Sequence, residues 1–270
     1  MKGENGIMKR ILKTFAVLAL VAGSVLPAMA GMLDDIRSRN VVRIGVSLGG
    51  EPIGFRDAQN NPVGYDVDVA TMLAAKLGVP VEFTDVSGDA RISMLVSGQL
   101  DIVVANTSAT LERAKSVSFT IPYNRAGLRV IVQADSGIKT LADLAGKKVL
   151  VGRGTTGETF MKKAAPNAEL VYVDQFAPDG VLQLQQKRVD AAIEDSSLLD
   201  YLATKTPSLV TLPGLYSNDP ISIAVAKGDP DFVRWLDMFV SDYIQSGSYE
   251  ANYKKWWGKT ANPPTLNPLW

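Results

Sequence analysis

One stretch of the chain, residues 100–113, combines the residue types that bind a small anion. Asn, Thr and Ser occupy 106–108, directly after residues 101–105, a run that is apolar after Asp101 and predicts a strand. Thr110 predicts a helix start, because its hydroxyl can accept a hydrogen bond from an amide of the first turn. Arg113 then falls in that first turn, where the helix dipole favours negative charge. Beside free amides and hydroxyls, this arginine forms a candidate anion site. The alternative is a surface arginine that only begins a helix.

Three polar clusters in this chain each follow the carboxyl end of a predicted strand. They are Asn106-Thr107-Ser108 with Arg113, Gly154-Thr155-Thr156-Gly157, and Glu194-Asp195. Ligands of open α/β sheets bind at that edge, so the clusters are expected to share one cleft. A guanidinium, hydroxyls and a carboxylate suit a small zwitterion, with Arg113 and Thr156 on its carboxylate and Asp195 on its ammonium. The alternative is that Thr155, Thr156 and Asp195 are only helix caps.

The run Gly152–Gly157 also imitates a dinucleotide fingerprint, because it matches G-x-G-x-x-G after a predicted strand. Asp174 follows at the end of the next strand, where the fingerprint has its acidic residue. Glu158 counts against this interpretation, since its charge would repel a pyrophosphate. The α/β unit is also short for a dinucleotide domain. The N-terminal pattern described below predicts export, and an exported protein lacks a ready nicotinamide pool.

The elements that must position these clusters fall into two α/β units. Up to residue 133 the chain is expected to have strands at 41–46, 80–85, 101–105 and 128–133 and helices at 66–77 and 90–96, with Asp66 as a cap, Gly78 as a stop and a loop at 119–123. From residue 141 the alternation starts again, with strands at 148–152, 169–173 and 189–193 and helices at 141–144, 158–165, 179–186 and 197–204. A strand at 221–226 and helices at 231–245 and 249–257 end the chain. Such alternation predicts mostly parallel sheets covered by helices.

Crossings between the two units are expected near residues 123–127 and 217–220. Two crossings make the first unit discontinuous and form a hinge candidate. We therefore predict one lobe from residues 31–125 and 220–270, and a second lobe, 126–219, inserted into it.

The composition of this 270-residue chain excludes several kinds of chemistry. It contains no cysteine and no histidine, which rules out disulfides and thiolate sites and removes the commonest general base and metal ligand. The formal net charge is zero and no basic stripe indicates a nucleic-acid partner. We expect neither a metal nor a cofactor.

The N-terminus has the pattern of a secretory signal peptide. Lys9, Arg10 and Lys13 precede the apolar run 15–26, and Ala28-Met-Ala30 supplies an A-x-A cleavage site. Residues 1–30 are therefore predicted to be removed and the mature protein to be exported to the periplasm. An uncleaved anchor is the alternative, although the apolar run is too short for a stable membrane span.

A series of motifs resembles the family-3 periplasmic solute-binding proteins, the polar-amino-acid receptors of ABC importers. The motifs are Gly64-Tyr-Asp-Val-Asp-Val-Ala70, Arg91-Ile-Ser-Met-Leu-Val-Ser-Gly98, Asp101, Thr110-Leu-Glu-Arg113, Phe119 with Pro122-Tyr123, Gly154-Thr-Thr156 and Asp190-Ala-Ala-Ile-Glu-Asp195. The resemblance extends from about Ile36 to Gly258 and is specific as a set. It implies a two-lobed, hinged α/β fold that closes on an L-amino acid and delivers it to an inner-membrane permease, with the protein a monomer.

The resemblance also implies roles for individual residues. Arg113, with Ser108 and Thr156, matches the residues that hold the ligand α-carboxylate, and Asp195 and the carbonyl of Asn106 match those that hold the ammonium. The candidates for the remainder of the site are Thr155, Ser47, Gly152, Arg91, Glu194 and Glu51. Glycines stand at 50 and 88, where many members carry aromatic rings, so either backbone contacts replace the rings, or the pocket is roomier or takes a ligand that needs no stacking.

The identity of the ligand side chain and two other function classes stay open at this stage. Arg91 resembles an arginine that reaches the ligand in some acidic-amino-acid receptors, which favours a polar or acidic side chain, although it could instead brace the cleft wall. A periplasmic enzyme like cyclohexadienyl dehydratase, with Glu194 as general acid, is the alternative function. A sensory input domain is a third, disfavoured because no membrane span or signalling domain follows.

Overall fold

The strands of the protein form two five-stranded sheets and one two-stranded ribbon in the part of the chain that the structure describes. This computed structural model describes residues 31–176 and 179–266, so the predicted signal peptide lies outside the described residues. The first sheet has the order β4 (Val81–Asp85), β1 (Val42–Val46), β5 (Ile102–Val103), β12 (Asp219–Ala226) and β6 (Val117–Ala126). The second has the order β11 (Leu209–Thr211), β7 (Leu128–Gln133), β10 (Ala191–Asp195), β8 (Lys148–Gly152) and β9 (Glu169–Val173), and the ribbon pairs β2 (Phe55–Arg56) with β3 (Pro62–Val63).

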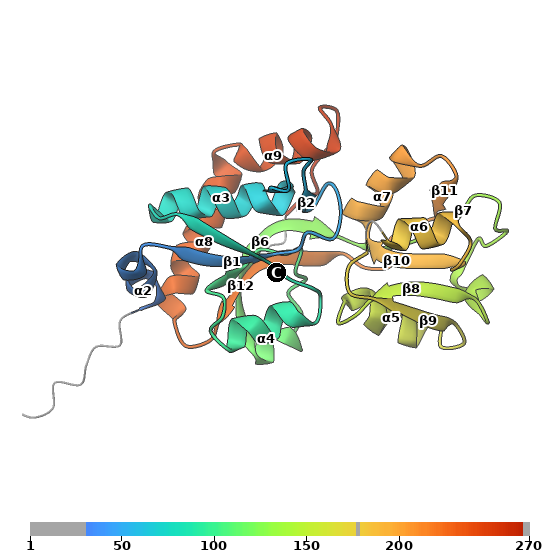
Figure 1. The fold of residues 1–270 in the computed structure, drawn as a ribbon, viewed down its shortest axis with the longest axis horizontal. Coiled ribbons are helices and arrows are strands. Elements are labelled where there is room, and N and C mark those ends of the chain that lie inside the picture. Colours follow the sequence, from blue (N-terminus) through green and yellow to red (C-terminus); the bar gives the residue numbers. More distant parts are fainter. Residues whose placement is uncertain (1–30, 177–178, 267–270) are drawn as a thin grey trace, which may run out of the picture. The chain divides into compact units, whose positions relative to one another are not determined.

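Helices cover both faces of the first sheet (Figure 1). They are α2 (Met32–Arg39), α3 (Tyr65–Leu77), α4 (Ala90–Val96), α8 (Pro230–Gln245) and α9 (Ser248–Trp257). One apolar core packs α3, α8 and α9 against one face, and a smaller core packs α4 against the other. We call this sheet with its helices the first lobe.

The second sheet is covered in the same way and, with its helices, forms the second lobe. Its helices are α5 (Thr156–Ala164), α6 (Asp179–Gln185) and α7 (Ser196–Lys205), and a 3₁₀ turn spans Leu141–Leu144. Met161 of α5 belongs to the core on one face, whereas Leu184 of α6 and Leu199 of α7 belong to the core on the other. This two-lobed α/β fold confirms the predicted fold class, while the residue limits of the lobes stay a prediction. None of the helices in the described ranges combines the length and the apolar character needed to cross a membrane.

Parallel strands at the centre of each sheet bring polar loops to one edge. β1 pairs in parallel with β4 and β5, and β8 pairs in parallel with β9 and β10. The inner strands β1, β5, β8 and β10 are mostly buried apolar runs, as expected for strands covered on both faces, whereas the edge strands β4 and β9 are partly exposed. Ser47, Asn106 and Gly152 stand at or just beyond the carboxyl ends of β1, β5 and β8.

Two local predictions around Arg113 were wrong. Thr110 Oγ1 does accept the Arg113 amide at 3.2 Å, but only one 3₁₀ turn, Arg113–Lys115, follows it. The chain then enters β6, which includes the predicted loop at 119–123. Pro122 is tolerated in this strand because it lies where the pairing of β6 with β12 shifts register, so no ladder bond needs its missing N–H.

The prediction that Asp66 caps α3 was also wrong. Gly64 is the N-cap, with φ of 136°, and a Cβ there would lie 2.4 Å from the Ile53 carbonyl oxygen. Asp66 lies inside the first turn, and its side chain is 1% exposed. The end of α3 agrees with the prediction, because Gly78 adopts the left-handed conformation that terminates the helix.

Candidate ligand-binding site

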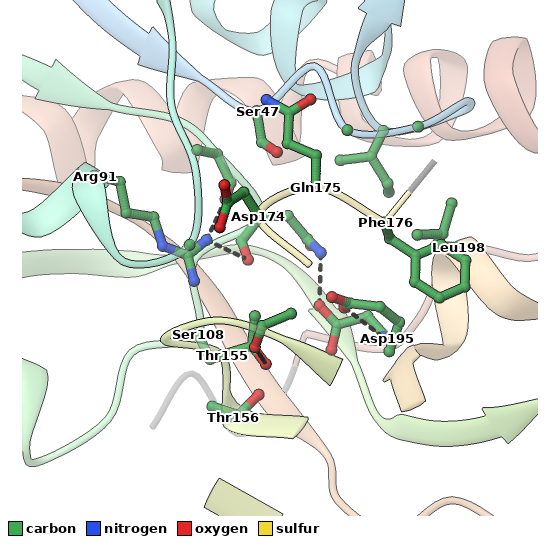
Figure 2. Close-up of a pocket in the computed structure, with 18 residues that line it drawn as sticks. Ser47, Arg91, Ser108, Thr155, Thr156, Asp174, Gln175, Phe176, Asp195 and Leu198 are labelled. Atoms are coloured by element: carbon green, nitrogen blue, oxygen red, sulfur yellow. Dashed lines mark hydrogen bonds between the residues drawn. The ribbon is translucent and has the colours of Figure 1, made fainter. Parts of the chain in front are cut away.

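A cavity between the two lobes collects residues from the carboxyl ends of strands in both sheets (Figure 2). Nine of the ten predicted binding residues line it, and Arg113 is the exception. The lining residues are Ser47, Gly49, Gly50, Ile53, Gly88, Arg91, Ala105, Asn106, Ser108, Gly152, Thr155, Thr156, Asp174, Gln175, Phe176, Glu194, Asp195 and Leu198.

Arg91 supplies the cavity with a buried positive charge. It comes from the first turn of α4, and 7% of the residue is exposed. Its Nη1 donates to the carbonyls of Ala105 and Asn106 at 2.7 and 3.5 Å, while its Nε is buried without a hydrogen-bond partner. Burial lowers the pKa of Arg91, whereas the charges of Glu194 and Asp195 oppose that shift. A buried donor without a partner is costly, so this guanidinium is suited to an incoming anion.

Asp195 and Glu194 supply the cavity with negative charge. Asp195 is 4% exposed, its Oδ2 accepts the Asn106 Nδ2 at 2.6 Å, and its Oδ1 is buried without a partner. Although Asp195 is the N-cap residue of α7, its side chain makes no capping bond there, which removes the simple cap as an explanation. Burial raises the pKa of both carboxyls, and the adjacent Glu194 raises the pKa of Asp195 further. A cation at Oδ1 would relieve both costs.

Arg113 stands beside the cavity instead of lining it. Its Nη1 donates to the Ser108 carbonyl at 2.8 Å, and its Nη2 donates across the cleft to the Gly154 carbonyl at 2.9 Å. Burial, together with the positive charge of Arg91, lowers the pKa of Arg113 to about 9. This arginine is therefore held at the rim by the two loops that also line the cavity.

The second lobe contributes a threonine pair at the start of α5. Thr155 is the N-cap of α5, because its Oγ1 accepts the Glu158 amide at 3.2 Å and also donates to the Gly152 carbonyl at 2.8 Å. Thr155 thus has the capping role that the sequence left as an alternative. Thr156 is the first residue of α5 and also lines the cavity, as Figure 2 shows.

The imitation of a dinucleotide fingerprint is not supported by the loop geometry. The Gly154 amide donates to Glu158 Oε2 at 2.8 Å, so this carboxylate occupies an amide that a pyrophosphate would need. Asp174, the supposed ribose ligand, lines the same cavity as Asp195. In the described residues no group of three or more acidic side chains could hold a metal ion.

Several hydrogen bonds join the lobes around the cavity, so the described conformation is closed. Besides the bonds from Asn106 and Arg113, Gln175 Nε2 donates to Asp85 Oδ1 at 2.9 Å and Trp257 Nε1 donates to the Ser197 carbonyl at 2.8 Å. Glu51, a further candidate, accepts the Tyr201 hydroxyl at 2.6 Å and lies in a neighbouring groove. These bonds hold the edges of the two sheets together.

Sequence reasoning missed one wall of the cavity. This wall consists of Ile53, Leu198 and the segment Asp174-Gln175-Phe176, which follows β9. Figure 2 shows Phe176 beside Leu198, on the opposite side of the view from Arg91. The position of this segment directly after a predicted strand is the sequence signal that could have placed it at the cavity. From the sequence, Asp174 is interpreted only as the acidic residue of a dinucleotide fingerprint.

Gly88 allows the lobes to approach each other closely. A Cβ on Gly88 would lie 2.5 Å from the Arg153 carbonyl oxygen and 3.2 Å from Thr155 Cγ2, both in the second lobe. An aromatic ring at this position could not fit the closed conformation. Of the two explanations offered for the missing rings, backbone contact therefore applies at Gly88. Gly50 instead forms two backbone hydrogen bonds with Gly54, of 2.9 and 3.1 Å.

Substitution of Gly88 by alanine should prevent full closure. The added methyl group meets a backbone oxygen that cannot rotate away, so the closed state is destabilised and ligand affinity should fall about tenfold, equivalent to about 1.4 kcal/mol. Calorimetric titration of Gly88→Ala would measure this. Gly157→Ala is the control, because its Cβ would have only ordinary contacts, the nearest at 3.4 Å. An unchanged affinity for Gly88→Ala would show that binding does not need this approach.

Comparison with known proteins agrees with the fold and shows the family of the chain. The family described as bacterial extracellular solute-binding proteins, family 3, matches residues 42–259. The L-cystine-binding protein TcyJ of Escherichia coli (strain K12) is 28% identical over 246 residues, covering 89% of this chain and 92% of TcyJ. The chain belongs to the family-3 bacterial extracellular solute-binding proteins.

Two solved structures extend this similarity. A mutant of ArgBP from T. maritima has a TM-score of 0.79 and 35% identity, covering 83% of this chain and 98% of that one. The ancestral amino acid-binding protein AncCDT-1, a precursor of cyclohexadienyl dehydratase, has a TM-score of 0.78 and 33% identity, covering 83% and 99%.

Proposed function

We propose that this protein is the substrate-binding component of an ABC importer and captures an L-amino acid with a polar or acidic side chain. The observation that carries the proposal is the pair of buried, oppositely charged groups in one cavity. Arg91 Nε and Asp195 Oδ1 are both buried without a hydrogen-bond partner. Since unpaired buried charges are costly, an amino acid that places its α-ammonium at Asp195 and a polar or acidic side chain at Arg91 would gain from both contacts. The family of the chain and the amino-acid-binding names of its relatives support the same class of ligand.

The ligand backbone is assigned to five residues at the lobe interface. Asp195 and Asn106 bind the α-ammonium, and Arg113 with Ser108 and Thr156 binds the α-carboxylate at the rim. Arg113 can turn to a ligand carboxylate because its present partners are two neutral carbonyls, and a charge-assisted bond is stronger than a neutral one.

The ligand side chain is assigned to the space near Arg91, Ser47, Gly152 and Glu194. A Cβ on Gly152 would lie 3.0 Å from Glu194 Oε1, so this glycine makes room for the carboxyl group. Burial raises the pKa of Glu194, so this carboxyl is inclined to carry a proton, which leaves Arg91 as the dominant charge for the side chain. An acidic side chain, such as that of glutamate, therefore suits the cavity best.

Binding is coupled to closure of the two lobes. The first lobe supplies Asn106, Arg91 and Arg113, and the second supplies Thr156 and Asp195 only when the lobes meet. A ligand that bridges both sets stabilises the closed state by its differential contacts. The closed, monomeric protein then presents the amino acid to an inner-membrane permease from the periplasm.

A thermal-shift screen of the refolded protein against all common amino acids tests the proposal. Unfolding and refolding strips any ligand that was carried over. A ligand at about 100 times its Kd stabilises the folded state by about 2.7 kcal/mol, which is readily measured. The largest shift is expected with glutamate or aspartate. No shift with any amino acid would overturn the assignment.

Substitution of Arg113 by alanine should weaken amino-acid binding by about 10- to 150-fold. One charge-assisted hydrogen bond contributes about 1.5–3 kcal/mol, and the alanine variant removes the guanidinium completely. Lys115→Ala is the matched control, because Lys115 lies in the same 3₁₀ turn and pairs with the exposed Glu112 at 2.5 Å. Calorimetry that finds equal affinities for both variants would exclude Arg113 from the site.

An enzymatic role is the second candidate. Glu194 lines the cavity with a raised pKa, as a general acid requires, and the ancestral neighbour is described as a precursor of a dehydratase. Turnover of a prephenate-like acid, followed by product absorbance and lost in Glu194→Gln, would support this role. We expect no turnover, since the cavity has the charge arrangement of an amino-acid clamp.

A further inference from the structure

The buried carboxylate of Asp66 lies directly behind the ligand cavity. It does not line the cavity, and 1% of the residue is exposed. Its Oδ2 accepts the Asn106 amide at 2.6 Å, and its Oδ1 accepts the Tyr123 hydroxyl at 2.8 Å. The two carboxylate oxygens of Asp66 thus accept hydrogen bonds from the Asn106 loop and from a tyrosine of β6, and Asp66 does not cap its own helix.

The loop that Asp66 holds has an unusual backbone at Asn106. The φ angle of Asn106 is 45°, in the left-handed region that asparagine enters more readily than most residues but still at a cost. A charge-assisted bond from the Asn106 amide to a carboxylate can offset that cost. The bond to Asp66 stabilises the left-handed backbone of Asn106, and this backbone conformation sets the direction of the Asn106 side chain.

In this conformation Asn106 makes hydrogen bonds with both charged sides of the cavity. Its Nδ2 donates across the cleft to Asp195 at 2.6 Å, and its carbonyl, with that of Ala105, accepts the Arg91 guanidinium. Burial raises the pKa of Asp66 to about 7 and lowers that of Arg91, and the charge of each group opposes the shift of the other. One carboxylate behind the loop is therefore connected to both charged ends of the cavity.

We infer that Asp66 is the positioning residue of the ligand site, fixing Asn106 so that Asp195 is set to bind the α-ammonium of the ligand and Arg91 its side chain. The identity of the ligand in this inference rests on the proposed function, whereas the stabilisation of the Asn106 loop by Asp66 does not depend on which ligand binds. The hydrogen-bonding partner on the far side, Tyr123, keeps the carboxylate oriented, and the Tyr65 hydroxyl in turn donates to the Tyr123 carbonyl at 3.1 Å.

Two substitutions at Asp66 separate hydrogen bonding from a general loss of structure. Asp66→Ala removes both bonds. Asp66→Asn can still accept the Asn106 amide through its Oδ1 and donate its amide to the Tyr123 oxygen, so it should largely rescue the loop. Asp68→Asn is the matched control, because Asp68 lies in the same turn of α3 but bonds to Lys255 and Trp256 at 2.5 and 2.7 Å.

The first measurement is amide hydrogen exchange at Asn106 by NMR in the protein without ligand. We expect exchange at least about tenfold faster in Asp66→Ala, near the wild-type rate in Asp66→Asn, and unchanged in Asp68→Asn. Equal exchange in Asp66→Ala and wild type would overturn the inference, whatever the ligand is. Faster exchange with a wild-type protein that binds no amino acid would support the hold on the loop and reject the proposed function.

The second measurement is calorimetric titration of the same variants with L-glutamate. We expect Asp66→Ala to lose about 10- to 150-fold in affinity and Asp66→Asn to recover most of it, the range of one charge-assisted bond. In an Asn106→Ala background the loss should shrink, because the route through the Asn106 side chain is already absent. A loosened loop with undiminished affinity for glutamate would show that Asp66 is structural only.

Discussion

Asp195→Asn is expected to lower amino-acid affinity more than 100-fold while making the protein without ligand more stable at neutral pH. The affinity falls because the ammonium loses its only charged partner among the contacts assigned to it, and the remaining amide can offer a neutral acceptor at best. Removing one member of a buried charge pair costs about 3–5 kcal/mol. Calorimetric titration with the amino acid identified by the thermal-shift screen measures this loss.

The gain in stability follows from the raised pKa of Asp195. Burial and then the neighbouring Glu194 raise the pKa in the folded protein above its ordinary value, so the unfolded chain releases this proton at lower pH than the folded protein does. Stability without ligand therefore falls as pH rises from the ordinary carboxyl range through the raised pKa. Asparagine carries no charge and removes this contribution, so the melting temperature of Asp195→Asn should exceed that of wild type near pH 8.

Binding of an ammonium has the opposite dependence on pH, because affinity rises where the stability of the protein without ligand falls. The ligand favours the charged form of Asp195, so proton release should accompany binding, and wild-type affinity should rise with pH by up to tenfold per unit. Calorimetry in two buffers of different ionisation enthalpy counts the protons, and the count should fall in Asp195→Asn, with Glu194 and Asp66 supplying any remainder.

Asp190→Asn is the control for this prediction. Asp190 directly precedes β10, and its Oδ2 accepts the Lys148 amide at 2.8 Å, which an asparagine can also do. A normal proton count and normal affinity in Asp195→Asn would show that the ammonium binds elsewhere.

Much of the fold could be predicted because its signals are local. β8 and β9 lie at the predicted residues, and α4 spans 90–96 as expected, since short β-branched runs and amphipathic spacing between glycines specify these elements within one window. The 3₁₀ turn after Thr110 and the strand through Pro122 were predicted wrongly. There the antiparallel pairing of β6 with β12, a partner about a hundred residues away, decides the outcome.

The site residues also separate into those that local sequence patterns predict and those that depend on long-range packing. Asn106 and Asp195 could be placed at the cavity because strand ends in a parallel sheet share an edge. The inward direction of Asp66 could not be predicted, since an acidic residue in the first turn of a helix normally indicates a cap. Phe176 was missed because its contact with the cavity depends on how the two lobes meet, which one sequence does not encode locally.

Arg91→Met is expected to abolish the preference for an acidic over an amide side chain. In the wild type the buried guanidinium should favour glutamate over glutamine, because a buried charge pair is replaced by a charge–dipole contact in the amide complex. Methionine removes that difference, so affinity for glutamate should fall more than 100-fold and affinity for glutamine about tenfold or less. The ratio of the two dissociation constants, measured by calorimetry on each variant, is the decisive quantity.

The ratio of the two dissociation constants also shows whether Arg91 contacts the ligand side chain or only supports the loop around it. Arg91 donates to the Ala105 carbonyl, so any substitution that loosens this loop weakens both ligands alike and leaves the ratio unchanged. Arg91→Lys keeps the charge but cannot serve the carbonyls and a ligand in the same geometry, so it should weaken both ligands and retain a preference for glutamate. Arg129→Met is the control outside the cavity, since Arg129 likewise donates to backbone carbonyls, those of Leu212 and Gly214. A wild-type ratio in Arg91→Met would assign this arginine to the cleft wall, and the acidic side chain would have to be recognised without it.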